Sequence, residues 1–159
     1  MISCKQGANN KSNSSSTTLQ KKDDTIKTMT PSKEYSQAVI NEMLDSSFRY
    51  GNQSAYNKVS NYYLLNSLDE EFLFYALIMA NRYHEPAAYY DVYEILTLKT
   101  YDNHLENIDS TTRAIAIYYL LKAHELGYES SKYPIEQIFT SKNRAIPKSS
   151  DYIIFKKTE

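Results

Sequence analysis

The sequence predicts an all-α fold, a right-handed stack of about three antiparallel helical hairpins that together form a short α-solenoid. The first observation is self-similarity, because the apolar pattern around Val59 recurs around Val92 after 33 residues and around Ile135 after a further 43. Intervals of this size are typical of helical hairpin repeats, which stack to bury a shared core. The second observation is that apolar residues recur at three- and four-residue spacing, which favours amphipathic helices over strands.

The composition agrees with one modest folded domain and argues against a nucleic-acid partner. The chain has 159 residues, and 42% of them are hydrophobic, which is enough to build a core. Its formal net charge is −1, so it has no broad positive field of the kind that attracts DNA or RNA. We therefore expect no nucleic acid among its partners.

The first four residues resemble the end of a bacterial lipoprotein signal peptide. Ile2 and Ser3 precede Cys4 as the residues of a lipobox do, and Cys4 is the single cysteine of the chain. We expect Cys4 to be lipidated and the protein to be anchored in the bacterial cell envelope, on the periplasmic face or the surface. The alternative is a cytoplasmic protein with an ordinary thiol.

Three regions follow from the composition. Residues 1–29 are almost free of apolar side chains after Cys4, and we expect them to be a disordered tether. Residues 30–142 carry the periodic pattern and form the predicted helical repeat domain. Residues 143–159 are too short to fold alone, and we expect them to act as a C-terminal tail or cap.

The first predicted hairpin begins at Thr30-Pro31, because a hydroxyl side chain followed by proline suits a helix start. Its first helix runs to Tyr50 and ends at Gly51, and its second spans 54–66. The predicted inward residues of the two helices are Tyr35, Ala38, Val39, Met43, Leu44, Ala55, Tyr56, Val59, Tyr62 and Tyr63.

The second predicted hairpin begins with three acids, Asp69, Glu70 and Glu71, which favour the positive end of a helix dipole. The apolar run 72–80 predicts a central buried helix and is far shorter than the roughly 20 residues that span a bilayer. His84-Glu85-Pro86 makes the turn, and the partner helix spans 87–98. The predicted inward residues of that helix are Ala88, Val92, Ile95 and Leu96.

The third predicted hairpin follows a polar insert over 97–110. Ser110 or Thr111 caps a helix over 112–126, which ends at Gly127 and is followed by a last helix with Pro134 near its start. The predicted inward residues are Ala116, Tyr119, Leu120, Ala123, Ile135, Ile138 and Phe139. The tail is expected to cover the exposed end of the stack.

Two stretches, 75–84 and 118–128, resemble Sel1-like repeats, a subclass of the tetratricopeptide superfamily. The second stretch carries an aromatic-rich helix with a Lys122-Ala123 step and Gly127, as such repeats do. The likeness covers roughly residues 34–140. It departs from the family pattern where His84 replaces the turn glycine and where Ser131 replaces a small alanine. The resemblance implies a protein-binding scaffold without chemistry of its own.

No catalytic, metal-binding or cofactor site is predicted. His84-Glu85 and His124-Glu125 lack the second histidine of a zinc-protease motif, since Ala88 and Tyr128 occupy that position. His104-Leu105-Glu106 lacks the cysteine pair of a zinc deaminase. The chain has three glycines, none in a phosphate-binding loop.

The predicted binding residues are aromatic and basic side chains of the kind that is enriched at protein interfaces. They are Tyr75, Arg82, Tyr90, Tyr93, Tyr118 and Lys122. Tyr89 and Tyr119 are expected in the core instead. The leading hypothesis is a non-catalytic module that binds another protein with the first helices of its hairpins. The alternatives are an immunity-type inhibitor of a toxic enzyme and a degenerate enzyme or metal-binding protein.

Overall fold

In the computed structural model, which describes residues 35–98 and 105–152, the chain is helical, with turns and short loops between the helices. No strand occurs in this described part, so the all-α prediction is confirmed. The α-helices are α1 (Gln37–Tyr50), α2 (Gln53–Leu65), α3 (Asp69–Tyr83), α4 (Pro86–Thr97), α5 (Ser110–Glu125) and α6 (Lys132–Ile138). Short 3-10 helices cover Leu105–Asn107, Glu129–Ser131, Thr140–Lys142 and Ser149–Asp151.

Helix α1 begins later than predicted. Tyr35 and Ser36 are not helical, and the Ser36 hydroxyl accepts a hydrogen bond from the backbone N–H of Val39, so Ser36 is the N-cap. A serine in this position satisfies one of the free amides of the first turn. The predicted start at Thr30-Pro31 lies outside the described residues.

The turn between α1 and α2 is as short as predicted. Gly51 ends α1 with a left-handed backbone, at φ 64°, and its N–H donates to the carbonyl of Ser47. Asn52 then caps α2, because its side-chain oxygen accepts a hydrogen bond from the N–H of Ala55 at 3.1 Å. Two residues therefore reverse the chain between the helices.

Helices α3 and α4 also follow the predicted boundaries closely. The three acids occupy the first turn of α3, and His84 ends the helix in a left-handed conformation at φ 54°. Histidine adopts this conformation less readily than glycine does. Pro86 lies in the first turn of α4, where a missing N–H costs little.

Helix α5 starts two residues before the predicted position because its cap is Asp109, not Ser110 or Thr111. The Asp109 carboxylate accepts hydrogen bonds from the N–H groups of Thr111 and Thr112, both at 3.0 Å. The hydrogen bonds from Thr112 and Thr111 hold the pKa of Asp109 below its usual range. An aspartate at the positive end of a helix is favourable for the same reason.

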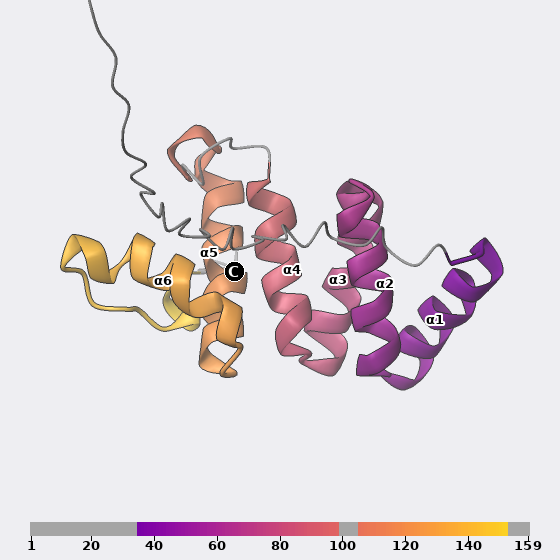
Figure 1. Cartoon of the computed structure of the whole chain (residues 1–159). Coiled ribbons are helices and arrows are strands. Elements are labelled where there is room, and N and C mark those ends of the chain that lie inside the picture. Colours follow the sequence, from indigo (N-terminus) through magenta and orange to yellow (C-terminus); the bar gives the residue numbers. More distant parts are fainter. Residues whose placement is uncertain (1–34, 99–104, 153–159) are drawn as a thin grey trace, which may run out of the picture. The chain divides into compact units, whose positions relative to one another are not determined.

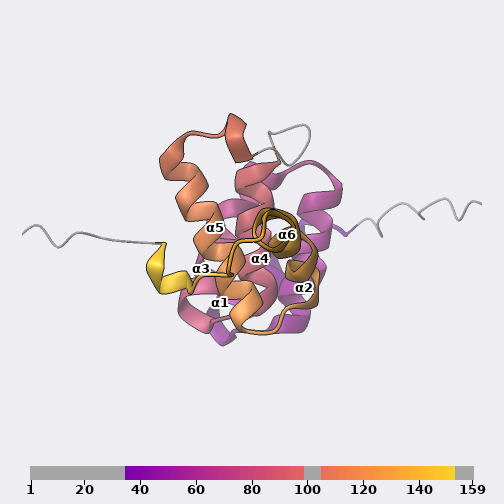
Figure 2. The same cartoon turned by 90° about the vertical axis from the view of Figure 1, so that its left-hand side faces the viewer.

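The helices pack mainly on their neighbours in the chain. Helix α4 lies between α3 and α5 (Figure 1), and α1 contacts both α2 and α3. Figure 2 looks along this row of helices, with α6 in front. One continuous set of buried apolar side chains joins α1 through α6, with Val92, Phe72 and Leu120 among its fully enclosed members. Tyr89 and Tyr119 belong to this core, as predicted.

The buried face of α1 differs from the predicted one. Ile40, Leu44 and Ser47 are buried at intervals of four and three residues, whereas Ala38 and Val39 are exposed. The Ser47 hydroxyl enters the core because it donates to the backbone carbonyl of Met43. A serine can therefore occupy an inward position that the apolar pattern alone assigns elsewhere.

Helix α3 is not buried all round, which corrects the prediction for the run 72–80. Phe72, Ala76, Met79 and Ala80 are buried, but Phe74 exposes 65% of its surface. Phe74 therefore lies on the side of α3 that faces away from the buried Phe72 and Ala76.

The described part of the tail, up to residue 152, contacts α5 and the end of α6. The backbone N–H and the hydroxyl of Ser149 donate to the two carboxylate oxygens of Glu125, at 2.7 and 2.8 Å. Tyr152 meets the ring of Phe139 edge to face, with 6.4 Å between centroids. These contacts fix the segment after α6 against α5 and α6.

Candidate functional site

The outward face of α3 forms a shallow hollow of about 490 Å³, here called the α3 outer surface. Its residues are Phe74, Leu77, Ile78, Asn81 and Arg82. These positions recur at three- and four-residue spacing, so they share one side of the helix, away from the buried Phe72 and Ala76. An exposed phenylalanine between two partly exposed aliphatic side chains is the kind of patch that proteins use for contacts.

The α3 outer surface is tied to α5 through Asn81. Its side-chain amide donates to the hydroxyl of Tyr119 and to the carbonyl of Leu77, both at 2.8 Å. The amide is thereby held in one orientation. Two helices that are not adjacent in the chain therefore meet at the edge of this surface.

Three more of the predicted binding residues lie on α3 and α5. Arg82 belongs to α3, and Tyr118 and Lys122 belong to α5. The Arg82 guanidinium lies 5.3 Å from the ring centroid of Tyr83 and is exposed. Lys122 lies 6.0 Å from the Tyr118 ring, and its ammonium is 3.6 Å from the carboxylate of Glu125. Both cations therefore lie over aromatic rings, but only Arg82 is exposed and without a carboxylate partner among the described residues, whereas Lys122 pairs with Glu125.

Tyr75 lies on the opposite side of α3 from Leu77 and packs against α1. Its ring stacks on Phe48 with 4.9 Å between centroids and 14° between planes, and it is half-buried. Tyr63 and Phe72 also surround it, each with its centroid 6.2 Å away. Arg82 lies two turns after Tyr75 on the same side of α3, over the ring of Tyr83, whose hydroxyl donates to the carbonyl of Phe48.

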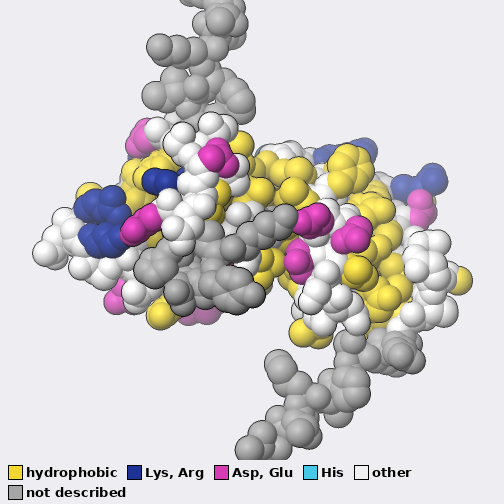
Figure 3. Space-filling model, turned by 90° about the horizontal axis from the view of Figure 1, so that it is seen from above, with side chains coloured by type: hydrophobic (Ala, Val, Ile, Leu, Met, Phe, Trp, Pro, Cys, Tyr) yellow, Lys and Arg dark blue, Asp and Glu magenta, His cyan; other side chains and the backbone are white. Residues whose placement is uncertain are grey.

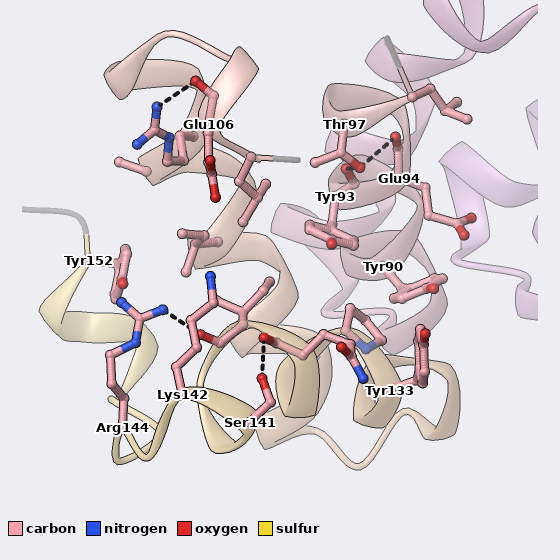
Figure 4. A pocket seen from close by; sticks show the side chains of 18 of the residues that line it. Tyr90, Tyr93, Glu94, Thr97, Glu106, Tyr133, Ser141, Lys142, Arg144 and Tyr152 are labelled. Atoms are coloured by element: carbon pink, nitrogen blue, oxygen red, sulfur yellow. Dashed lines mark hydrogen bonds between the residues drawn. The ribbon is translucent and has the colours of Figure 1, made fainter. Parts of the chain in front are cut away.

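A second hollow, of about 820 Å³, lies between α4, α5 and α6 and is here called the α4–α6 groove (Figure 4). Tyr90 and Tyr93 of α4 line one side, with 5.9 Å between their centroids, and Ile117 of α5 contributes apolar floor. Tyr133 and Lys142 line the side that follows from α6. The structure thus brings Tyr90 and Tyr93 together, but in this groove and not on the α3 outer surface.

Tyr90 and Tyr93 are neutral hydrogen-bonding groups. Burial, followed by the nearby Glu94 carboxylate, raises the pKa of Tyr93 to about 12 and raises that of Tyr90 further. Burial also raises the pKa of Glu94, which hydrogen-bonds with Tyr90. The phenol groups therefore keep their protons at physiological pH and can donate as well as accept.

A buried polar cluster between α2 and α4 was not predicted. Asp91 Oδ2 accepts hydrogen bonds from the Tyr56 hydroxyl and the Ser60 hydroxyl, both at 2.7 Å. Burial raises the pKa of Asp91, while these two hydrogen bonds oppose the rise and the charge of Glu85 adds to it. Glu85 is itself buried, and its Oε2 has no hydrogen-bond partner among the described residues. One signal was available, since Asp91 lies one residue before the predicted inward Val92 in a largely apolar helix, and a buried acid needs a partner.

The remaining predicted residue, Cys4, lies outside the described residues. Within 35–98 and 105–152, no group of three or more His, Cys, Asp and Glu side chains is placed to share a metal ion. No helix in the same ranges combines the length and the apolar content that crossing a bilayer requires. The face seen in Figure 3 mixes hydrophobic side chains with small separate groups of positive and negative ones.

Comparisons with protein-family models, with curated proteins and with solved structures found no match for this chain.

Proposed function

We propose that this chain is a non-catalytic protein-binding module whose contact surface is the α3 outer surface, with neighbouring α5 side chains at its rim. The observation that carries the proposal is Phe74, which exposes 65% of its surface in the middle of a helix whose other face is buried. A solvated phenylalanine has no role in the core of the chain. Large exposed aromatic side chains are the usual anchors of protein contacts.

The surroundings of Phe74 suit a contact of this kind. Leu77 and Ile78 extend the apolar area, while Arg82 supplies positive charge at its edge. Interfaces commonly combine an apolar centre with a polar rim, and arginine is enriched in them. The partner that fits is a protein with an apolar patch bordered by carboxylates.

We also propose that the helices form three stacked hairpins of tetratricopeptide type, α1–α2, α3–α4 and α5–α6. The proposal is supported by the order of contacts, since each helix packs on the next, and by the contact of α1 with α3. In this arrangement α3 and α5 are first helices of their hairpins. The proposed contact surface would then be the face that such repeats commonly present to partners.

We further propose that Cys4 carries a lipid that anchors the module to a bacterial envelope membrane. The lipobox-like residues before Cys4 support this proposal. The test is labelling of growing cells with an alkyne-bearing fatty acid, using the gene with its native upstream sequence. Label that is present in the wild type and absent in Cys4→Ser supports the anchor, and unlabelled wild-type protein rejects it.

The protein-binding proposal is tested by affinity capture from an extract of the source cells. Phe74→Asp places a charge on the proposed surface, and Leu65→Asp is the matched control, because Leu65 is similarly exposed, at 61%, but lies on α2. The proposal predicts a protein that wild type and Leu65→Asp capture and Phe74→Asp does not. Equal capture by all three chains would reject the α3 outer surface as the binding site.

A further inference from the structure

The α4–α6 groove has aromatic walls and unused hydrogen-bonding groups. The hydroxyls of Tyr93, Tyr133 and Tyr152 and the side-chain amide of Gln137 line it, and none of these groups hydrogen-bonds to another described residue. Tyr133 is 67% exposed, so its ring is available to a ligand. At about 820 Å³, the groove lies within the range of roughly 300–1,000 Å³ that is usual for ligand sites.

Three cations line the groove, and two of them are already engaged. Arg113 donates to the carbonyls of Ile108 and Glu106, at 2.8 and 3.4 Å, and Arg144 donates to the carbonyl of Ile138. Lys142 differs, because its ammonium makes no ion pair and no hydrogen bond with any described residue. Its side chain lies among the residues drawn in the hollow of Figure 4.

Two carboxylates also line the groove, and they do not neutralise Lys142. Glu94 hydrogen-bonds with the hydroxyl of Tyr90, on the α4 side. Glu106 belongs to the 3-10 helix Leu105–Asn107 and forms no ion pair with a described residue. The lining therefore carries one more positive than negative charge, and its free cation lies on the α6 side.

We propose that the α4–α6 groove binds a short acidic peptide segment that carries aromatic side chains, with Lys142 as its anchoring cation. The ligand's aromatic rings pack against the half-buried Tyr90 and the exposed Tyr133, in the offset or edge-on geometries that aromatic pairs prefer. Its carboxylate pairs with Lys142. Its main chain, which offers both donors and acceptors, hydrogen-bonds to the tyrosine hydroxyls and to Gln137. This site is separate from the α3 outer surface.

The probe is the tetrapeptide acetyl-Glu-Phe-Glu-Phe-amide, titrated into the full chain and followed by the backbone amide signals in nuclear magnetic resonance. Acetyl-Gln-Phe-Gln-Phe-amide is the neutral match, and acetyl-Lys-Phe-Lys-Phe-amide reverses the charge. We expect the signals of residues lining the groove to shift with the acidic peptide. We expect weaker binding of the neutral peptide, by about fivefold or more, and the weakest binding of the basic one.

Two lysine variants locate the charge effect. Lys142→Gln is expected to weaken binding of the acidic peptide by about fivefold and to leave binding of the neutral peptide unchanged. Lys132→Gln is the matched control, because Lys132 is an exposed lysine of α6 that pairs with Glu129 and does not line the groove. Both variants change exposed side chains, so folding is not at risk.

Three results would overturn the proposal. The first is equal binding of the acidic and neutral peptides, or no shift of groove signals with either. The second is an equal effect of Lys142→Gln and Lys132→Gln. The third is binding of 3-phenylpropionate as tight as that of the acidic peptide, which would assign the groove to small organic acids instead. Phe74→Asp is expected to leave peptide binding unchanged, so failure here is distinguishable from failure of the proposed function.

Discussion

The hydroxyl of Tyr56 donates a 2.7 Å hydrogen bond to the buried carboxylate of Asp91 and so joins α2 to α4. Ser60, one turn after Tyr56, donates to the same oxygen. These two helices are second helices of successive hairpins in the proposed repeat arrangement. A polar contact in the core therefore fixes their relative position, since both hydroxyls need this acceptor to remain paired.

Removing the Asp91 side-chain oxygens should lower the free energy of unfolding more than replacing the carboxyl group with a neutral amide. Asp91→Ala leaves the buried hydroxyls of Tyr56 and Ser60 without an acceptor, so we expect the free energy of unfolding to fall by about 2–3 kcal/mol. Asp91→Asn keeps a side-chain oxygen in place and should cost less than about 1 kcal/mol. Urea unfolding curves measure both values. Equal losses for the two variants would show that the hydrogen bonds do not stabilise the fold.

The same carboxyl group should make stability depend on pH. Burial raises the pKa of Asp91 in the folded protein. The contribution of Asp91 to stability is therefore full below its pKa in the unfolded chain, about 3.9, and is lost as the pH rises through its pKa in the folded protein. Asp91→Asn has no such loss. Its stability relative to wild type should therefore increase as the pH rises from about 4 to 8.

Asp109 is the control for this pH dependence, because its pKa is shifted in the opposite direction from that of Asp91. Its pKa is lowered by hydrogen bonds from Thr112 and Thr111, so its contribution is present above the unfolded pKa and is lost as the pH falls through the folded value. Asp109→Asn should lose stability relative to wild type as the pH rises. Parallel curves for the two variants would contradict the assigned pKa directions.

Two left-handed glycines should respond differently to alanine. A Cβ at Gly51 would lie 2.6 Å from Cδ1 of the Tyr83 ring, whereas at Gly127 nothing lies within 4 Å. Both substitutions incur the left-handed strain of about 1–2 kcal/mol, and Gly51→Ala must also displace a ring whose hydroxyl bonds to the carbonyl of Phe48. We expect Gly51→Ala to lower the melting temperature clearly more than Gly127→Ala. Similar melting temperatures would mean that Tyr83 does not pack on this turn.

A buried and an exposed apolar residue should tolerate aspartate very differently. Val92 is fully buried, so Val92→Asp places an unpaired charge in the core and should abolish the cooperative thermal transition seen by circular dichroism. Phe74→Asp should change stability by no more than about 0.5 kcal/mol, because its ring is largely in solvent. An undisturbed melt of Val92→Asp would show that the core is assigned wrongly.

The helices could be predicted from the sequence because local signals coincide with apolar spacing. Gly51, Pro86 and the acids from Asp69 onward mark helix ends, and the structure places ends there. The exceptions have a common cause. Ser36 and Asp109 replaced the predicted caps because several hydroxyl and acidic residues precede each helix, and only the three-dimensional hydrogen bond identifies the one that caps.

The candidate sites were less predictable because they depend on which apolar face is left outside. The run 72–80 is apolar on more than one side, so periodicity could not separate buried Phe72 from exposed Phe74. Likewise, Tyr90 and Tyr93 were candidates by residue type, but their groove also needs side chains from α6 and the following 3-10 helix. Such contacts between distant segments leave no mark on local spacing.

The most direct test of the central claim, that the α3 outer surface binds another protein, is photo-crosslinking in the source cells. A photoreactive phenylalanine analogue is introduced at position 74 and, as the control, at the similarly exposed position 65 on α2. The account predicts a discrete adduct of higher mass from position 74 and none from position 65. No adduct from position 74, or the same adduct from both positions, would contradict it.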